Sequence, residues 1–139
     1  MAGFALTCIG GFIRGRSHQA LGEFFSWKLA GRDDHELVTT GPYAYVRHPA
    51  YLGTTLQCIG NVLTFFDEGS WWKECALGLL GEGVIYRTIG YAYMGWWGLL
   101  ISYLWFRVDG EDAGLSMEFG SLWQTWAEKV RYRLVPYVY

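Results

Sequence analysis

The sequence predicts an all-α protein: a helical bundle in a membrane, with at least two transmembrane helices and a C-terminal amphipathic segment in the cytosol. The first observation is the composition, which is 52% hydrophobic and 19% aromatic but only 17% charged, whereas soluble domains carry about 25% charged residues. The second is a pair of uncharged apolar runs that approach the roughly 20 residues needed to cross the hydrocarbon core. The 139 residues are expected to form a single domain.

The N-terminal stretch, Met1–Ile13, is uncharged. No basic residues precede it and no clear small-residue cleavage site closes it, so it does not resemble a secretory signal. We interpret it as the tail of a longer membrane span, which predicts a domain that lacks its N-terminal spans in this chain.

Two candidate spans follow, Ala50–Phe66 and Thr88–Phe106, and neither contains a charged residue. The segment between them, Ala76–Tyr86, is short and interrupted by Glu82, so we expect a partial or interfacial helix or an extension of the second span. Basic residues lie before the first span and after the second, and such flanks stay in the cytosol. The alternative is a pair of hydrophobic core helices in a soluble protein.

The bulk charge and the cysteines exclude several functions. A net charge of −2 argues against a general nucleic-acid binder, which needs a basic face. The three cysteines are widely spaced and form no CxxC or Cys/His cluster, so neither a disulfide framework nor a metal site is expected.

The stretch His35–Gly53, HELVTTGPYAYVRHPAYLG, carries the first group of candidate residues. Gly41 opens a turn, and Pro49 suits the first turn of a helix. His48 would then lie at a helix N-terminus, whose N–H groups favour anions, and Gly53 would let a ligand approach the backbone closely. The alternative is a charged interfacial anchor followed by an ordinary span.

The second group follows the second span, where Arg107 and Glu111 are one helical turn apart. A surface pair at this spacing contributes only a few tenths of a kcal/mol, but ionisable residues where a membrane helix ends are candidates for function. The tail, Ser121–Tyr139, has the spacing of an amphipathic helix on the membrane surface that ends before Pro136.

Three motifs occur in order: HxLVTxGPYxxVRHPxYxG from His35, RxxxE[ED]xxLxxxFGxxW from Arg107 to Trp123, and VxxRLVP from Val130. Together they make the chain resemble the isoprenylcysteine carboxyl methyltransferase family, within a wider group that includes phospholipid methyltransferases. The resemblance runs from about Arg16 to Tyr139, with the middle matched only in hydropathy. One departure is that the family's second glutamate is Asp112 here.

The resemblance implies S-adenosylmethionine as cofactor, with the methyl group passing to the carboxylate of a prenylated cysteine, either in a protein C-terminus or in a small prenylcysteine. It implies an endoplasmic reticulum membrane location with the active site facing the cytosol. It assigns cofactor binding to eight residues: His35, Leu37, Val38, Gly41, His48, Pro49, Tyr51 and Gly53. It assigns catalysis to Arg107 and Glu111, which would meet both cofactor and acceptor.

Our hypothesis for the reaction is that Arg107 holds the acceptor carboxylate while Glu111 orients Arg107 or a polar group of the cofactor. One alternative is a phospholipid or amine N-methyltransferase, in which Glu111 or His48 must act as a base because an ammonium acceptor first loses a proton. The other is a truncated, non-catalytic membrane protein of the same family.

Overall fold

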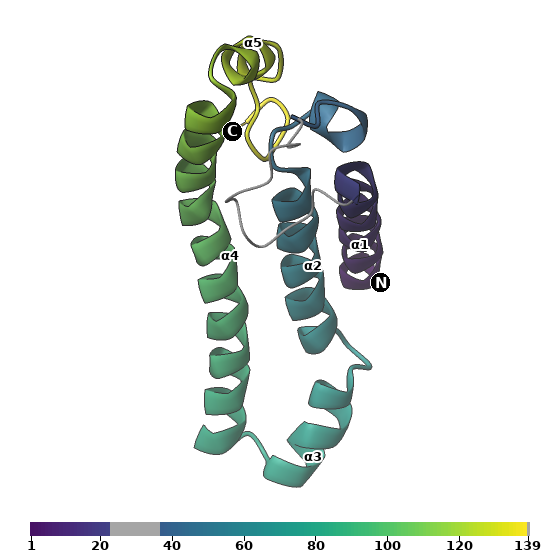
Figure 1. Cartoon of the computed structure of the whole chain (residues 1–139). Coiled ribbons are helices and arrows are strands. Elements are labelled where there is room, and N and C mark those ends of the chain that lie inside the picture. Colours follow the sequence, from purple (N-terminus) through teal and green to yellow (C-terminus); the bar gives the residue numbers. More distant parts are fainter. Residues whose placement is uncertain (23–36, 139) are drawn as a thin grey trace.

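The computed structural model describes residues 1–22 and 37–138, and within these ranges the chain is helical, with no β-strand. Figure 1 shows α1 and α2 side by side, with the much longer α4 across from them, α3 at one end and α5 at the other. The elements in chain order are α1 (Ala2–Leu21), a 3-10 turn (Gly41–Ala44), α2 (Pro49–Phe66), a π-helical turn (Trp72–Ala76), α3 (Leu77–Leu80), α4 (Val84–Phe119) and α5 (Ser121–Lys129). The prediction of an all-α fold is confirmed.

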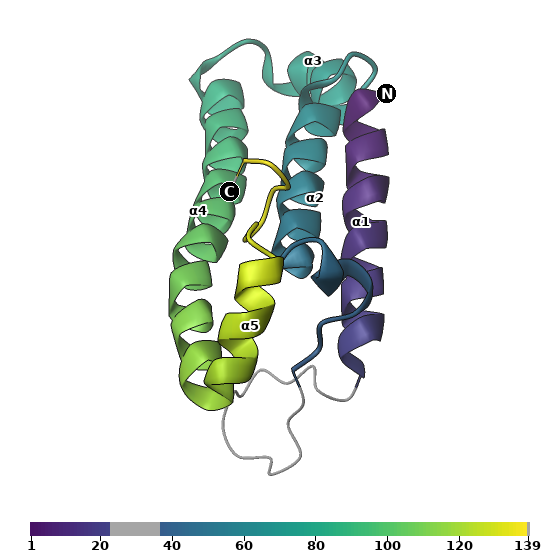
Figure 2. The ribbon, with the colours of Figure 1, turned by 90° about the horizontal axis from the view of Figure 1, so that it is seen from above.

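Glycines allow α1 and α2 to pack backbone against backbone as an antiparallel pair, which both views show (Figures 1 and 2). A Cβ atom on Gly10 would lie 2.8 Å from the backbone nitrogen of Gln57, and one on Gly53 would lie 2.7 Å from the carbonyl oxygen of Gly10. Gly60 meets Gly3 in the same way one heptad further along. Close approach of this kind needs small residues at the contact.

Aromatic stacking joins the end of α2 to α4. The ring of Phe65 lies 4.0 Å from that of Tyr93, centroid to centroid, and 4.8 Å from that of Trp72, which in turn stacks on Tyr86 at 4.6 Å. Aromatic pairs stabilise a structure by about 0.5–1.5 kcal/mol each beyond the burial of their area. These contacts fix α4 at the end of the molecule remote from α5.

The expected spans coincide with helices but are not confirmed as membrane spans. The helix α2 follows the first apolar run closely, whereas α4 contains the second run and continues for 13 residues beyond Phe106, to Phe119. Of the helices in the described ranges, none combines the length and the apolarity that crossing a membrane requires. The partial helix expected within Ala76–Tyr86 is present as α3, which ends at Leu80 before α4 begins at Val84.

The C-terminal tail differs from the prediction. The helix α5 ends at Lys129 rather than just before Pro136, so the predicted helix is too long. Val130 and Leu134 are buried, with 7% and 1% of their surface exposed. The chain leaves the helix because an extended path buries these two side chains and brings backbone carbonyls to the start of α2.

Candidate functional site

The site begins where the loop before α2 becomes helix. Pro49 occupies the first helical position and is fully buried, and His48 caps the helix with non-helical backbone angles. The N–H groups of Arg47 and His48 donate to the carbonyls of Tyr132 (2.9 Å) and Arg133 (2.8 Å) in the C-terminal tail. This backbone pairing holds the His48 side chain in the interior, where only 7% of its surface is exposed.

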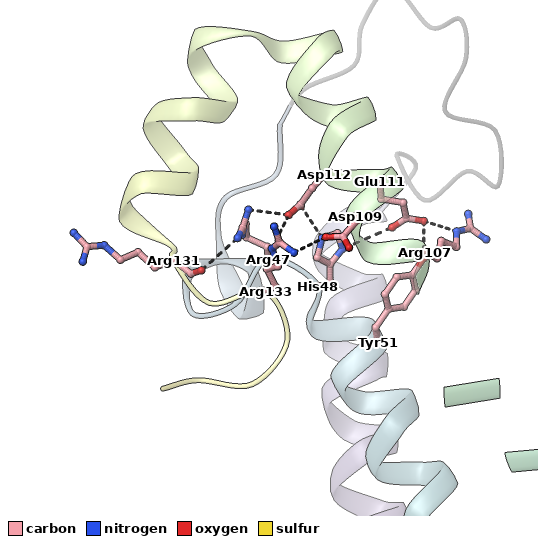
Figure 3. A network of polar contacts seen from close by, with 9 residues as sticks. All are labelled: Arg47, His48, Tyr51, Arg107, Asp109, Glu111, Asp112, Arg131 and Arg133. Carbon is pink, nitrogen blue, oxygen red and sulfur yellow. Dashed lines mark hydrogen bonds and ion pairs between the residues drawn. The ribbon is translucent and has the colours of Figure 1, made fainter. Parts of the chain in front are cut away.

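The opposite wall is the last part of α4. Val108 and Asp112 lie one turn apart and are buried, Val108 completely, so this face of α4 packs inward. Burial of an ionised carboxylate is costly unless it is paired. Asp112 and its neighbour Glu111 are both paired, and Figure 3 shows their side chains meeting those of the α2 start.

The imidazole of His48 lies between two consecutive carboxylates. Its Nε2 is 2.8 Å from Oδ1 of Asp112, and its Nδ1 is 3.6 Å from Oε2 of Glu111. An ionised carboxylate only accepts hydrogen bonds, so Nε2 is the donor toward Asp112. One ring therefore connects both acidic residues of the second motif to the RHP sequence of the first.

Glu111 also joins Tyr51 to Arg107. Its Oε1 accepts a hydrogen bond from the Tyr51 hydroxyl at 2.5 Å and from Nε of Arg107 at 2.7 Å. Charge-assisted bonds of this kind are roughly twice as strong as neutral ones. The Arg107 side chain is still 34% exposed, so its guanidinium remains reachable by a ligand.

Asp112 is a buried anion paired with two arginines and a histidine. Its Oδ2 lies 2.8 Å from Nη1 of Arg47 and 3.6 Å from Nε of Arg133. Burial raises the pKa of Asp112, but the hydrogen bond from His48 and the charges of His48, Arg47 and Arg133 outweigh burial and hold that pKa below its usual value. Asp112 is therefore ionised at neutral pH.

The loop before α2 forms a neighbouring wall against α5. Gly41 has a φ of +63°, a conformation that glycine adopts without strain, and it turns the chain so that Tyr43 is buried. Tyr43 packs with Trp126 and Val130, and Leu37 and Val38 pack against this cluster. Burial, and to a smaller extent the negative charge of Glu111, raise the pKa of Tyr43 above its usual value.

Two tryptophans of α5 carry buried indole donors that no described residue accepts. The indole N–H groups of Trp123 and Trp126 are buried, and no acceptor within the described ranges bonds to either. Buried indole N–H groups normally find a partner. These two donors lie on α5, beside the loop that the sequence assigned to the cofactor.

The structure brings together four of the predicted site residues: His48, Tyr51, Arg107 and Glu111. Pro49 starts their helix, and Leu37, Val38 and Gly41 lie in the adjoining loop. Gly53 faces α1, so the structure accounts for its small size by helix packing, and a contact with the cofactor stays a prediction. His35 lies outside the described residues.

Asp109 and Arg133, which form an ion pair with each other, were not among the predicted site residues. Asp109 and Asp112 are three residues apart on one helix, a spacing that puts both carboxylates near one face and is visible in the sequence. Arg133 follows α5 and reaches α4 from a non-helical segment, so no local pattern indicates its contact.

A hollow of about 610 Å³ lies at the opposite end of the molecule, between the π-helical turn, α3 and the start of α4. Its wall is charged and includes Glu68, Glu74 and Glu82. None of the residues predicted to act in catalysis or cofactor binding lines it.

Comparison with known proteins agrees with the motifs. Residues 3–80 match the model of the isoprenylcysteine carboxyl methyltransferase (ICMT) family. Protein-S-isoprenylcysteine O-methyltransferase of Schizosaccharomyces pombe is 30% identical over 125 residues, which is 88% of this chain and 44% of the relative. Delta(14)-sterol reductase TM7SF2 of Mus musculus is 26% identical over 104 residues, 75% of this chain and 20% of the relative. The chain thus spans less than half the length of these two relatives, and no solved structure matches it.

Proposed function

The chain belongs to the isoprenylcysteine carboxyl methyltransferase family, and from this premise we propose that it methylates the carboxylate of a prenylated cysteine with S-adenosylmethionine. The observation that carries the proposal is the position of Glu111. Its carboxylate contacts Tyr51 and Arg107 and faces His48, so it joins the residues expected to bind cofactor to the residue expected to bind the acceptor.

The residues present suit this cofactor. S-adenosylmethionine supplies an electrophilic methyl group, whose bond to sulfur breaks as a bond to the acceptor oxygen forms. Its adenosyl part offers ring nitrogens and ribose hydroxyls, which match the buried indole donors of Trp123 and Trp126, for which the described residues supply no acceptor. Its positive sulfonium suits the Glu111 carboxylate and the face of Tyr51, an aromatic contact of about 0.5–2 kcal/mol.

The ion pairs already formed in the cluster favour a carboxylate acceptor over an amine. The cluster pairs three guanidinium groups, on Arg47, Arg107 and Arg133, with three carboxylates. A carboxylate acceptor needs no base, whereas an ammonium acceptor does. Glu111, one of the two candidate bases of the amine reaction beside His48, already accepts hydrogen bonds from Tyr51 and Arg107, so it would have to give up an ion pair to act as that base.

In the proposed reaction Arg107 binds the acceptor carboxylate and Glu111 fixes the guanidinium plane through Nε. Alignment of reacting groups in this way lowers a barrier by several kcal/mol. The substrate would be the C-terminus of a prenylated protein or a small prenylcysteine.

The apolar surface of α4 suits a lipid-bearing substrate. Large exposed apolar side chains recur at helical spacing along α4, at intervals of three, four or seven residues, and end beside Arg107: Ile85, Ile89, Trp96, Leu99, Tyr103 and Phe106. Contiguous exposed apolar surface marks a membrane or ligand contact. We propose that this face meets the lipid of an endoplasmic reticulum membrane, with the polar cluster on the cytosolic side.

The test is methyl transfer from labelled S-adenosylmethionine by membranes containing the full chain. A farnesylated cysteine analogue and phosphatidylethanolamine are offered side by side. We expect label in a base-labile ester of the farnesyl compound, lost in Arg107→Ala and kept in Glu128→Gln, which alters an exposed residue of α5. Label in the phospholipid would replace the proposal with the amine reaction. Cofactor binding without transfer to either compound would indicate a non-catalytic protein.

A further inference from the structure

The C-terminal segment Val130–Leu134 lies against the start of α2. Its backbone carbonyls at Tyr132 and Arg133 accept the N–H groups of Arg47 and His48. The side chains at its two ends, Val130 and Leu134, are buried, with 7% and 1% of their surface exposed. Backbone pairing and apolar anchoring together set the register of this segment beside His48.

The side chain of Arg133 adds a second connection to the same histidine. It forms ion pairs with Asp109 and, at 3.6 Å from Nε to Oδ2, with Asp112. Asp112 holds Nε2 of His48. Arg133 therefore meets the His48–Asp112 pair at both ends. Its carbonyl accepts from the histidine backbone, and its guanidinium lies at the carboxylate (Figure 3).

The exposure of the Arg133 side chain indicates that the fold does not depend on it. Its side chain is 34% exposed, whereas that of Asp112 is 7% exposed. Truncation of Arg133 would remove a charge at the rim without opening a buried cavity. The backbone pairing and the buried side chains of Val130 and Leu134 would remain.

We infer that Arg133 is a positioning residue, which holds the His48 imidazole and the end of α4 in the arrangement that binds S-adenosylmethionine. The inference rests on the proposed function for the identity of that ligand. Arg133 itself takes up no proton and touches no reacting atom. It acts through Asp112, because an ion pair shared with Asp109 and Asp112 fixes one turn of α4 relative to the α2 start.

The experiment uses the full chain in detergent micelles, with Arg133→Ala, Arg133→Lys and the matched control Arg131→Ala. The Arg131 side chain is exposed and points away from the cluster in Figure 3, and alanine keeps the carbonyl that accepts from Arg47. Two quantities are measured: the Kd for S-adenosylmethionine, and the ¹⁵N shifts of the His48 ring without ligand, assigned with His48→Ala.

We expect Arg133→Ala to weaken binding about tenfold, the usual scale for a bond between charged groups, and to move the His48 signals. Arg133→Lys should recover part of the affinity, and Arg131→Ala should match the wild type. Unchanged affinity and unchanged signals in Arg133→Ala would overturn the inference. Weaker binding with unmoved His48 signals would also overturn it, since Arg133 would then contact the ligand directly.

A wild-type chain that binds no S-adenosylmethionine would instead contradict the proposed function. In that case the ¹⁵N shifts of His48 are the only test of whether Arg133 positions the imidazole. A shift in Arg133→Ala that is absent from Arg131→Ala supports it, and no shift refutes it.

Discussion

Nε2 of His48 donates a 2.8 Å hydrogen bond to Oδ1 of Asp112, across 64 residues of sequence and between the N-cap of α2 and the helix α4. Both side chains are 7% exposed. The same carboxylate also pairs with Arg47, so a buried anion is balanced by groups from the α2 start. This pair connects the first and second sequence motifs. Its contribution to the stability of the fold depends on pH in a defined way.

Asp112→Asn should destabilise the fold by about 3 kcal/mol at pH 7, because it leaves the charge of Arg47 buried without its anion. The folded-state pKa of Asp112 is lowered. The native state therefore binds fewer protons than the unfolded state. The stabilisation that the ionised Asp112 contributes is complete above the pKa of an aspartate in the unfolded chain, about 3.9. It is lost as the pH falls through the lower folded-state pKa.

Thermal unfolding of wild type and Asp112→Asn, followed by circular dichroism from pH 3 to pH 7, measures this difference. The difference in unfolding temperature between the wild type and Asp112→Asn should be largest above about pH 5 and should become smaller in acid. A gap that widens in acid would show that the carboxylate is not the stabilised form.

Glu111→Gln should reduce methyl transfer about 100-fold, because the amide carries no charge to hold the Arg107 guanidinium, and small misplacements near reacting groups cost rates of that size. The fold should persist, since the Glu111 side chain is part-exposed. Initial rates with the farnesylated substrate measure the effect, with Glu128→Gln as the exposed control. Equal rates in both variants would remove Glu111 from the reaction.

The rate of methyl transfer should be nearly constant between about pH 6 and pH 8, because an acceptor carboxyl with a pKa near 3.5 is already ionised throughout this range. A pH–rate profile at saturating cofactor tests this expectation. A rate that climbs with a midpoint near neutrality would indicate an essential base and an amine acceptor.

Gly10→Ala should destabilise the protein by about 1–3 kcal/mol, the usual cost of overpacking, since the added methyl group overlaps the backbone of α2. Gly15→Ala is the matched control on the same helix, because within the described residues no packing partner of α1 lies within 4 Å of the Cβ position of Gly15. The control should gain about 0.5–1 kcal/mol from helix propensity. Thermal unfolding of both variants distinguishes a packed seam from general glycine effects, and equal shifts would contradict the packing of α1 on α2.

Local pattern was sufficient for part of the site. The i,i+4 spacing predicted that Arg107 and Glu111 share a helix face, and they do, at 2.7 Å. Pro49 marked the start of α2 correctly. The packing of Gly53 against α1 could not be predicted from the sequence. A glycine that leaves room for a ligand and a glycine that leaves room for another helix have the same sequence pattern.

The sequence by itself determined the helical class, the start of α2 and the family, since these depend on residue periodicity, proline geometry and ordered motifs. Only the tertiary structure decided that α5 ends at Lys129 and that Arg133 reaches Asp112. The physical reason is that helix periodicity describes neighbours along the chain. The path of the tail depends instead on distant partners, which are the N–H groups of the α2 start and a buried carboxylate on α4.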